Sequence, residues 1–388
     1  MLENNKIYFD NAATTPLDPV VLDAMMPYLT KSFGNPSSLH SFGTDTKDTL
    51  ENCRNKFAGF IGATGDEIVF TSSGTESNNF ALKGIAFANR KKGNHIIVSC
   101  IEHDCVLESC KWLEDQGFFI TYLPVNNYGQ VELETLRKFI TPKTILVSVM
   151  HANNEIGTIQ DITEIGKICK EKNIYFHSDA CQSFGKVPID VNKMNIDLLT
   201  LNSHKIFGPK GVGALYIRNG VQITPWLHGG GQEKGFRSST ENLAGIVGFV
   251  EAADICMVDF EMEVKKVTKL RDKLIENILT SIDGSYLNGH PTIRLSNNIN
   301  IGINGLEGET IRLLLLLDGE GIAVSAGSAC SSNKNSSASH VLMAIGKNQF
   351  EARGSVRISL GRFNTEAEIE EFTSIFKQCV MKLNPIFT

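Results

Sequence analysis

The sequence lacks a long apolar run and an excess of charge of either sign. Its longest purely aliphatic run, residues 313–317, is far shorter than the ~20 apolar residues that a membrane helix needs. The first ten residues lack the apolar core of a signal peptide. With 37 basic and 43 acidic residues the formal net charge is −6, so no basic surplus indicates nucleic acid or an anionic membrane. We therefore expect a cytoplasmic protein that binds neither directly.

The sequence also lacks the cysteine spacing of a structural metal site. Nine cysteines are present, an odd number, and no two of them form a CxxC pair. The spacing of Cys100, Cys105 and Cys110 does not match that of structural zinc ligands. In a reducing compartment we expect most of the cysteines to be unpaired, buried thiols. A metalloprotein therefore has little support, and no metal ligand is predicted.

Short β-branched runs alternate with helical stretches from about residue 67 onward. The run at 144–150 is nearly all apolar, as expected for a strand that is buried on both faces. This alternation predicts an α/β fold with a mostly parallel sheet covered by helices. The predicted strands are 67–73, 94–100, 144–150, 174–180, 196–202 and 213–219, with helices over 75–93 and 161–173.

The pattern changes near residue 255 and becomes typical of a smaller α+β domain. The predicted helices there are 260–282, 309–317 and 365–383, and the predicted strands are 297–303, 322–327 and 356–360. We expect an N-terminal arm over 1–15 that joins the small domain, a large domain over 16–255, and the small domain over 256–388. The Ser- and Asn-rich stretch 330–340 is predicted to be a mobile loop.

Two residues at predicted strand ends suit covalent and acid–base chemistry. Lys205 follows a strand in the sequence SHK and precedes glycine-rich turns, where partial desolvation suits an imine-forming nucleophile. Asp179 ends the strand at 174–180, at the edge where open α/β sheets bind ligands. Taken singly, Lys205 is most simply a surface lysine, and Asp179 is most simply a helix cap.

Two further features follow other strands. Gly74 and Thr75 lie where a helix N-terminus would present amides to a phosphate, although an ordinary cap explains them as well. His103 follows the strand at 94–100 and could stack on a cofactor ring, although a lone histidine is more often structural. The coincidence of these features with Lys205 and Asp179 favours pyridoxal phosphate, which needs a lysine for a Schiff base and a carboxylate for its ring nitrogen.

A set of motifs extends over nearly the whole chain, from about residue 7 to residue 380. In order they are DNAATTPLDPVV, GNPSSLH, TSSGTESNN, EHDCV, HANNEIGTIQDI, HSDACQSFGK, SHKIFGPKGVGALY, GGGQEKGFRSST, GSACSS and VRISLGRFNTEAEI. With these motifs the chain resembles cysteine desulfurase, in the iron–sulfur-assembly branch of the class V aminotransferase family with the type I pyridoxal phosphate fold. That resemblance implies a large domain with a seven-stranded type of sheet, a smaller C-terminal domain and a homodimer.

The resemblance also implies roles for individual residues around the cofactor. Lys205 would bond the cofactor covalently, Asp179 would pair with its ring nitrogen, and Gln182 would contact its phenolic oxygen. His103 would stack over the ring and move protons on the substrate's sulfur. The remaining residues would contact the phosphate or the substrate: Gly74, Thr75, Ser203 and His204 at the phosphate, Thr240 at the phosphate of the neighbouring subunit, and Asn154 and Arg357 at the substrate carboxylate and the cofactor's edge.

Cys330 of GSAC would be the nucleophile that takes the sulfur from L-cysteine, leaving alanine and a persulfide. Its flanks, Gly-Ser-Ala before it and a polar stretch after it, argue against an inert buried thiol. The sulfur would pass to an iron–sulfur scaffold or to another acceptor, for cluster assembly or tRNA thiolation.

Three alternatives share this sequence pattern to different degrees. A selenocysteine lyase and a class V aminotransferase would use the same fold, but an aminotransferase has no use for Cys330 in a polar loop. A non-catalytic assembly partner would have no need of the intact set Lys205, Asp179, His103 and Cys330. A yellow protein would support the enzymes, and a colourless protein that refuses cofactor would support the partner.

Overall fold

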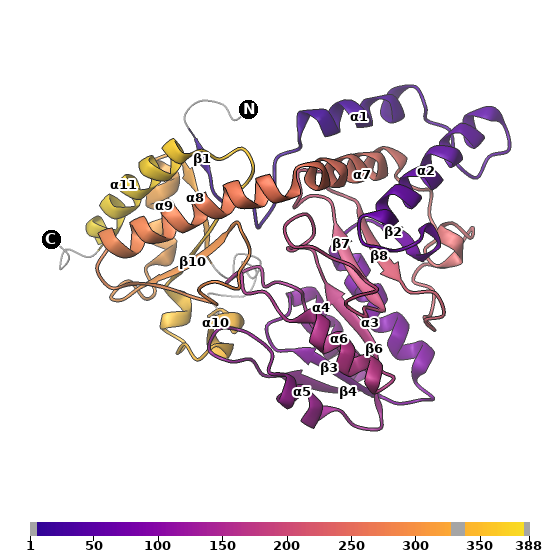
Figure 1. Cartoon of the computed structure of the whole chain (residues 1–388), viewed down its shortest axis with the longest axis horizontal. Coiled ribbons are helices and arrows are strands. Elements are labelled where there is room, and N and C mark those ends of the chain that lie inside the picture. Colours follow the sequence, from indigo (N-terminus) through magenta and orange to yellow (C-terminus); the bar gives the residue numbers. More distant parts are fainter. Residues whose placement is uncertain (1–5, 327–337, 384–388) are drawn as a thin grey trace.

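The structure is a computed structural model that describes residues 6–326 and 338–383. A seven-stranded sheet forms the centre of its larger part (Figure 1). Strand β8 is antiparallel to both of its neighbours, and the other strand pairs are parallel, which confirms the predicted mostly parallel sheet. The order across the sheet is β2 (Ile68–Thr71), β8 (Gly213–Ile217), β7 (Leu198–Asn202), β6 (Tyr175–Asp179), β5 (Thr144–Ser148), β3 (His95–Ser99) and β4 (Phe119–Leu123).

Helices cover both faces of this sheet, which is why its inner strands are apolar throughout. Ile96 and Val98 of β3 pack on one face with α3 (Gly74–Asn89) and α4 (Asp104–Asp115), whereas Ile97 points to the other face. That second face is covered by α2 (Ser41–Gly59), α5 (Leu133–Phe139), α6 (Ile162–Glu171) and α7 (Leu243–Val258), while α1 (Pro19–Thr30) packs against α7. All five residues of β5 are buried, as the apolar run predicts.

Helix α3, which confirms the helix predicted over 75–93, buries Phe80 and Gly84 on its apolar face but not Phe87. Phe87 is 38% exposed and packs edge-on against Trp112 of α4 at the margin of the core.

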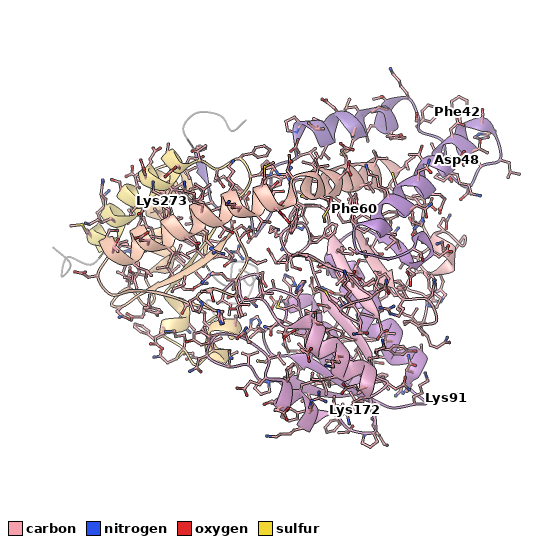
Figure 2. The ribbon with its side chains drawn as sticks, in the orientation of Figure 1. Phe42, Asp48, Phe60, Lys91, Lys172 and Lys273 are labelled. Carbon is pink, nitrogen blue, oxygen red and sulfur yellow. The ribbon has the colours of Figure 1, made fainter. Side chains whose placement is uncertain are left out.

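In Figure 2, Lys91 and Lys172 lie at the lower rim of the molecule, just past the ends of α3 and α6.

The smaller part is an antiparallel sheet with long helices. Its strands are β12 (Ser325–Ala326), β13 (Ser355–Ser359), β10 (Asn298–Ile303) and β9 (Ser285–Leu287), in that order. Helices α8 (Phe260–Ser281), α9 (Thr310–Gly319) and α11 (Glu366–Leu383) share its hydrophobic core, and α10 (His340–Ala344) is short. The helical run from α7 into α8 leads from the larger part to the smaller one (Figure 1).

The N-terminus returns to this smaller part. Strand β1 (Ile7–Tyr8) pairs in parallel with β11 (Ile322–Ala323), and Ile7 and Phe9 are buried in the same core as α8 and α11. The residue limits proposed for the arm and the two domains remain predictions. Within residues 6–326 and 338–383, no helix has the length and apolarity to cross a membrane.

Candidate active site

The candidate site lies at the carboxyl edge of the large sheet. Asp179 is the last residue of β6, and β7 ends at Asn202, directly before Ser203, His204 and Lys205. Strands β3 and β5 run parallel to β6 and lead to His103 and Asn154 at the same edge. Strand β2 also ends there, because two antiparallel pairings through β8 make it parallel to β7. Five chain segments therefore bring the predicted residues together at one edge, where open α/β sheets bind ligands.

Asp179 is a buried carboxylate with two hydrogen-bond donors. It is 5% exposed. Its Oδ2 accepts a hydrogen bond from Asn78 Nδ2 at 2.6 Å, and its Oδ1 accepts one from the Cys181 backbone N–H at 2.8 Å. These two contacts hold the carboxylate in a fixed orientation at the sheet edge.

His103 caps the helix that follows β3. Its Nδ1 accepts the backbone N–H of Cys105 at 3.2 Å, which places the proton of the neutral ring on Nε2. Burial, and next the positive charge of Lys205, lower the pKa of His103 below its ordinary value of 6.5. The imidazole is therefore neutral near pH 7, as a ring that exchanges a proton with a substrate must be.

The turn after β2 has the geometry of a phosphate cradle. Ser73 caps α3 by accepting the Glu76 backbone N–H, so α3 begins at Gly74 with its first amides unpaired within the helix. A Cβ built on Gly74 would lie 2.5 Å from the Sγ of Cys181, so any side chain there would displace its surroundings. Thr75, the next residue, is exposed.

Lys205 is half-buried, and its charge acts on four neighbouring side chains. It acts on the pKa values of His103, His204, Cys181 and Lys186, although burial is the largest cause in each case. The pKa of His204 falls to about 4, so this ring is neutral. The backbone carbonyl of Lys205 accepts a hydrogen bond from Lys186 Nζ at 3.1 Å.

Lys186 is a residue that the sequence analysis missed. Its Nζ donates to the carbonyls of both Gln182 and Lys205, at 3.1 Å each, and so joins two predicted cofactor contacts from different strand ends. Burial lowers the pKa of this lysine to about 8. The side chain of Gln182 donates to the carbonyl of Ala12 at 3.0 Å, which ties the N-terminal segment to the site.

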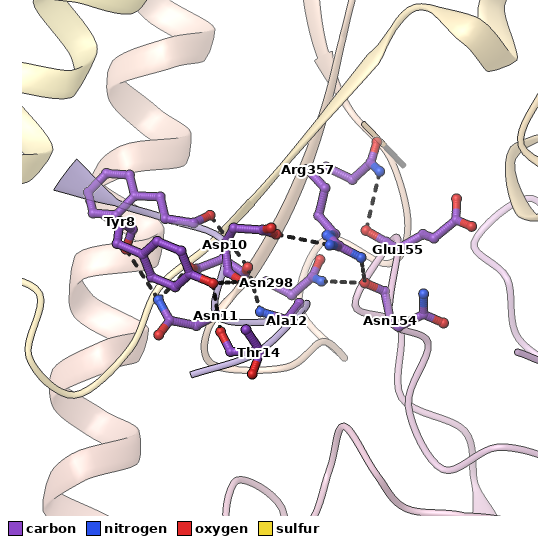
Figure 3. A network of polar contacts seen from close by, with 12 residues as sticks. Tyr8, Asp10, Asn11, Ala12, Thr14, Asn154, Glu155, Asn298 and Arg357 are labelled. Carbon is purple, nitrogen blue, oxygen red and sulfur yellow. Dashed lines mark hydrogen bonds and ion pairs between the residues drawn. The ribbon is translucent and has the colours of Figure 1, made fainter. Parts of the chain in front are cut away.

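Arg357 and Asn154 meet beside the N-terminal segment (Figure 3). The side chain of Arg357 is 2% exposed, and its Nη1 donates to the backbone carbonyl of Asn154 at 3.3 Å. Its Nη2 forms an ion pair with Asp10 Oδ1 at 3.0 Å. Asp10 was not predicted, although it opens the DNAATTP motif. A substrate carboxylate at Arg357 would share or replace this ion pair.

Two buried glutamates beside these residues were also missed. Glu102 precedes His103, and its Oε1 accepts hydrogen bonds from Ser99 Oγ at 2.5 Å and from the Met150 backbone N–H at 2.7 Å. Glu155 follows Asn154 and accepts a hydrogen bond from Ser339 Oγ at 2.5 Å. Burial raises the pKa of Glu102 to about 8 and that of Glu155 to about 7. Nothing in the sequence distinguishes a buried glutamate from an exposed one.

For two predicted site residues, the part of the chain that the structure describes shows no hydrogen bond or ion pair at this edge. Thr240 is exposed, in the segment that follows the short helix Glu233–Gly235. Cys330 lies outside the described residues, as does most of the loop predicted over 330–340. The eight cysteines within the described ranges are all free thiols, and those ranges contain no cluster of three metal-type ligands.

The residues present fit a polar, ring-shaped anion such as pyridoxal phosphate. Among the described residues, several buried polar atoms at this edge find no hydrogen-bond partner: Asn78 Oδ1, Gln182 Oε1, Asn202 Oδ1 and Ser203 Oγ. Buried polar atoms are normally paired, so such a group indicates a ligand. A cavity of about 920 Å³, lined by Lys92, Lys170 and Tyr175 among others, opens at the opposite edge and contains none of the predicted site residues.

A lysine, a paired carboxylate and a neutral histidine at the carboxyl edge of such a sheet define a pyridoxal phosphate enzyme of the α/β class. A protein-family model described as Aminotransferase class-V matches residues 7–372. The chain therefore belongs to the class V aminotransferase family, and its cofactor is pyridoxal phosphate.

Within that family, the chain is similar to cysteine desulfurases over nearly its full length. It is 53% identical to cysteine desulfurase IscS of Methanosarcina thermophila over 98% of this chain and 93% of the relative. It is 49% identical to the enzyme of the same name from Dictyoglomus turgidum, over 98% and 96%.

Solved structures agree with this placement. A NifS-like protein, 40% identical, superposes with a TM-score of 0.90 over 97% of this chain and all of that one. A structure described as SspA in complex with cysteine, 38% identical, superposes with a TM-score of 0.81 over 92% of this chain and all of that one.

Proposed function

We propose that this chain is a cysteine desulfurase that converts L-cysteine to L-alanine and takes the sulfur as a persulfide on Cys330. The observation that carries the proposal is the convergence of Lys205, Asp179 and His103 at one sheet edge. The similarity to cysteine desulfurases over the whole chain supports it, as does the relative whose structure contains cysteine.

The proposed cofactor contacts follow from the chemistry of the side chains. Lys205 Nζ would bond the cofactor, Asp179 would pair with its ring nitrogen, and Gln182 would face its phenolic oxygen. The first amides of α3 at Gly74 and Thr75, with Ser203 and His204, would hold the phosphate. When bound, pyridoxal phosphate supplies an electron sink that makes the Cα–H of a bonded amino acid acidic.

Two residues would then handle protons. Lys205 would take the proton from the substrate's Cα as a general base. His103, neutral because burial and Lys205 lower its pKa, would exchange a proton with the substrate's thiol through its ring. Arg357, with the Asn154 segment beside it, would orient the substrate by its α-carboxylate.

Cys330 would complete the reaction as a thiolate. Its Sγ attacks the sulfur of the substrate, a sulfur–sulfur bond forms, and the substrate's Cβ–S bond breaks. The electron pair of that bond and a proton remain with the carbon skeleton, so L-cysteine and one thiol give L-alanine and one persulfide. Cys105 and Cys181 are thiols on which the charge of Asp179 acts, but burial raises the pKa of Cys105 to about 12 and that of Cys181 well above 9. Neither thiol competes as a nucleophile near pH 7.

A homodimer is part of this proposal. Helix α1 and the loop and first turn of α2 that follow it expose several large apolar side chains, and such a patch marks a protein contact. Thr240 is also exposed, as a residue that reaches a neighbouring subunit must be. The apolar residues, 43–98% exposed, are Val20, Leu22, Met26, Leu29, Phe33, Leu39 and Phe42.

The persulfide would pass to an iron–sulfur scaffold or another acceptor protein in the cytoplasm. The arm over 1–15, the large domain over 16–255 and the small domain over 256–388 complete the proposed organisation. The pairing of β1 with β11 supports the proposed arm.

Incubation of the purified protein with L-cysteine tests the proposed function. Alanine should form with and without a reductant, and sulfide should be released in equal amount when a reductant is present. Alanine formation without any transferable sulfur, or pyruvate in place of alanine, would contradict the proposal. Sedimentation should give a dimer, and a fully active monomer would contradict the shared site.

A further inference from the structure

Asn78 links Asp179 to the neighbouring helix through a single buried amide. It lies in the first half of α3 and is 1% exposed. Its Nδ2 donates to Asp179 Oδ2 at 2.6 Å and to Cys105 Sγ at 3.2 Å, so both hydrogens of the amide are used. Asp179 is 101 residues away in the sequence, and neither contact is part of the secondary structure.

The same amide also acts on His103 through Cys105. The Sγ of Cys105 lies 3.1 Å from His103 Nδ1, and the backbone N–H of Cys105 donates to that same nitrogen. Asn78 therefore holds the carboxylate of Asp179, which is expected to pair with the ring nitrogen of the cofactor. It also holds the thiol of Cys105, which adjoins the imidazole of His103 that is expected to stack over the cofactor.

The electrostatic setting explains why a neutral donor stands here. Asp179 needs donors, because a buried polar oxygen without a hydrogen-bond partner is costly. A second carboxylate in place of Asn78 would repel Asp179, and an apolar residue would leave Oδ2 unpaired. The titratable groups around Asp179 are Glu102 and His103 after β3, Cys105 in α4, His177 in β6, Cys181 after β6 and Lys205 after β7.

We propose that Asn78 is a positioning residue that fixes the carboxylate of Asp179 for the ring nitrogen of pyridoxal phosphate. This inference rests on the proposed pairing of Asp179 with that nitrogen. Asn78 acts through Asp179 and needs no contact with the substrate.

Three variants of the full-length chain test the inference, each depleted of cofactor and titrated with pyridoxal phosphate while visible absorbance is recorded. Asn78→Ala removes the donor and should weaken cofactor binding at least tenfold at every pH from 6 to 8.5. Asn78→Asp keeps the shape of the side chain. The new carboxyl group can donate a hydrogen bond to Asp179 when it is protonated, and it repels the Asp179 carboxylate when it is ionised. Its affinity should be within threefold of the parent at pH 6 and fall at least tenfold more than that of the parent by pH 8.5.

Asn79→Ala is the matched control. Asn79 is the next residue in the same helix, and its amide contacts the Thr75 carbonyl and Ser109 rather than Asp179. This variant should bind the cofactor within threefold of the parent. A role for Asn78 in folding alone would give the two alanine variants the same affinity, or give Asn78→Asp the same pH dependence as the parent, and either result would overturn the inference.

Asp179→Asn separates this inference from the proposed function. If Asp179→Asn weakens binding and Asn78→Ala does not, the role of Asn78 is wrong and the pairing of Asp179 stands. If Asp179→Asn leaves both affinity and spectrum unchanged, the pairing itself is wrong, and the role of Asn78 fails with it.

Discussion

The buried ion pair between Arg54 and Glu233 gives the sharpest stability prediction. The two guanidinium Nη atoms contact the two carboxylate oxygens at 2.7 and 2.8 Å, and the side chains are each 2% exposed. Glu233 also accepts the backbone N–H of Phe70 in β2, at 2.8 Å. Glu233 has a φ of +48°, a strained value for a residue other than glycine, so the pair holds a strained turn against the sheet.

Removal of one partner leaves the other charge buried. We expect Arg54→Met to lower the free energy of unfolding by about 3–5 kcal/mol, because the buried carboxylate of Glu233 loses both guanidinium donors. The double variant Arg54→Met, Glu233→Met should lose less than the sum of the two single variants, since no charge is left unpaired. Urea unfolding followed by circular dichroism measures all three.

The outcome separates an energetically important pair from a passive one. A loss below about 1 kcal/mol for Arg54→Met, which is the range of exposed ion pairs, would refute the reasoning. Strict additivity in the double variant would refute it as well. The exposed pair of Lys193 with Asp190 is a control, because its lysine is 84% exposed and Lys193→Met should lose less than about 1 kcal/mol.

Three further predictions follow from the site. Lys205→Ala should abolish turnover and the yellow colour of the covalently held cofactor, which absorbance and an alanine assay check; near-normal activity would defeat the assignment. Gly74→Ala should weaken cofactor binding at least tenfold, because the new Cβ would lie 2.5 Å from Cys181 Sγ, and an unchanged affinity would show that the turn does not hold the phosphate. Glu102 has its pKa raised to about 8, so it stays protonated in the folded chain while the unfolded chain ionises above its ordinary value of 4.5. Because the folded chain keeps a proton on Glu102 that the unfolded chain releases, the free energy of unfolding falls as pH rises from about 4.5 to 8, by up to about 1.4 kcal/mol per pH unit. Glu102→Gln should remove that slope in urea unfolding at pH 5.5 and 8, and an unchanged slope would mean that Glu102 is ionised.

Six of the seven strands of the large sheet could be predicted from the sequence, because burial on both faces leaves an apolar trace; the edge strand β4, which is mostly not buried, was missed. Strands β5, β7 and β8 are runs in which every residue is buried. Helix α2 was not predicted, because its buried face includes Thr46 and Arg54 beside Leu50 and Phe57. A face with polar residues breaks the apolar period that identifies a helix.

The candidate site was predictable to a similar extent. Lys205, Asp179 and His103 follow strands, so parallel strands bring them to one edge. The ion pair of Asp10 with Arg357 joins residues 347 apart, and no local pattern encodes such a contact. The unusual states of Glu102 and Glu155 arise from burial that only the folded chain creates.

Mapping of transferred sulfur tests the central claim most directly. The holoenzyme is treated with sulfur-labelled L-cysteine without reductant, digested, and analysed by mass spectrometry while alanine is quantified. The account predicts one labelled sulfur atom per chain on the peptide that contains Cys330, with an equal amount of alanine, and neither product in Lys205→Ala. Label on Cys105 or Cys181 instead, or the parent yield of persulfide in Cys330→Ala, would contradict it.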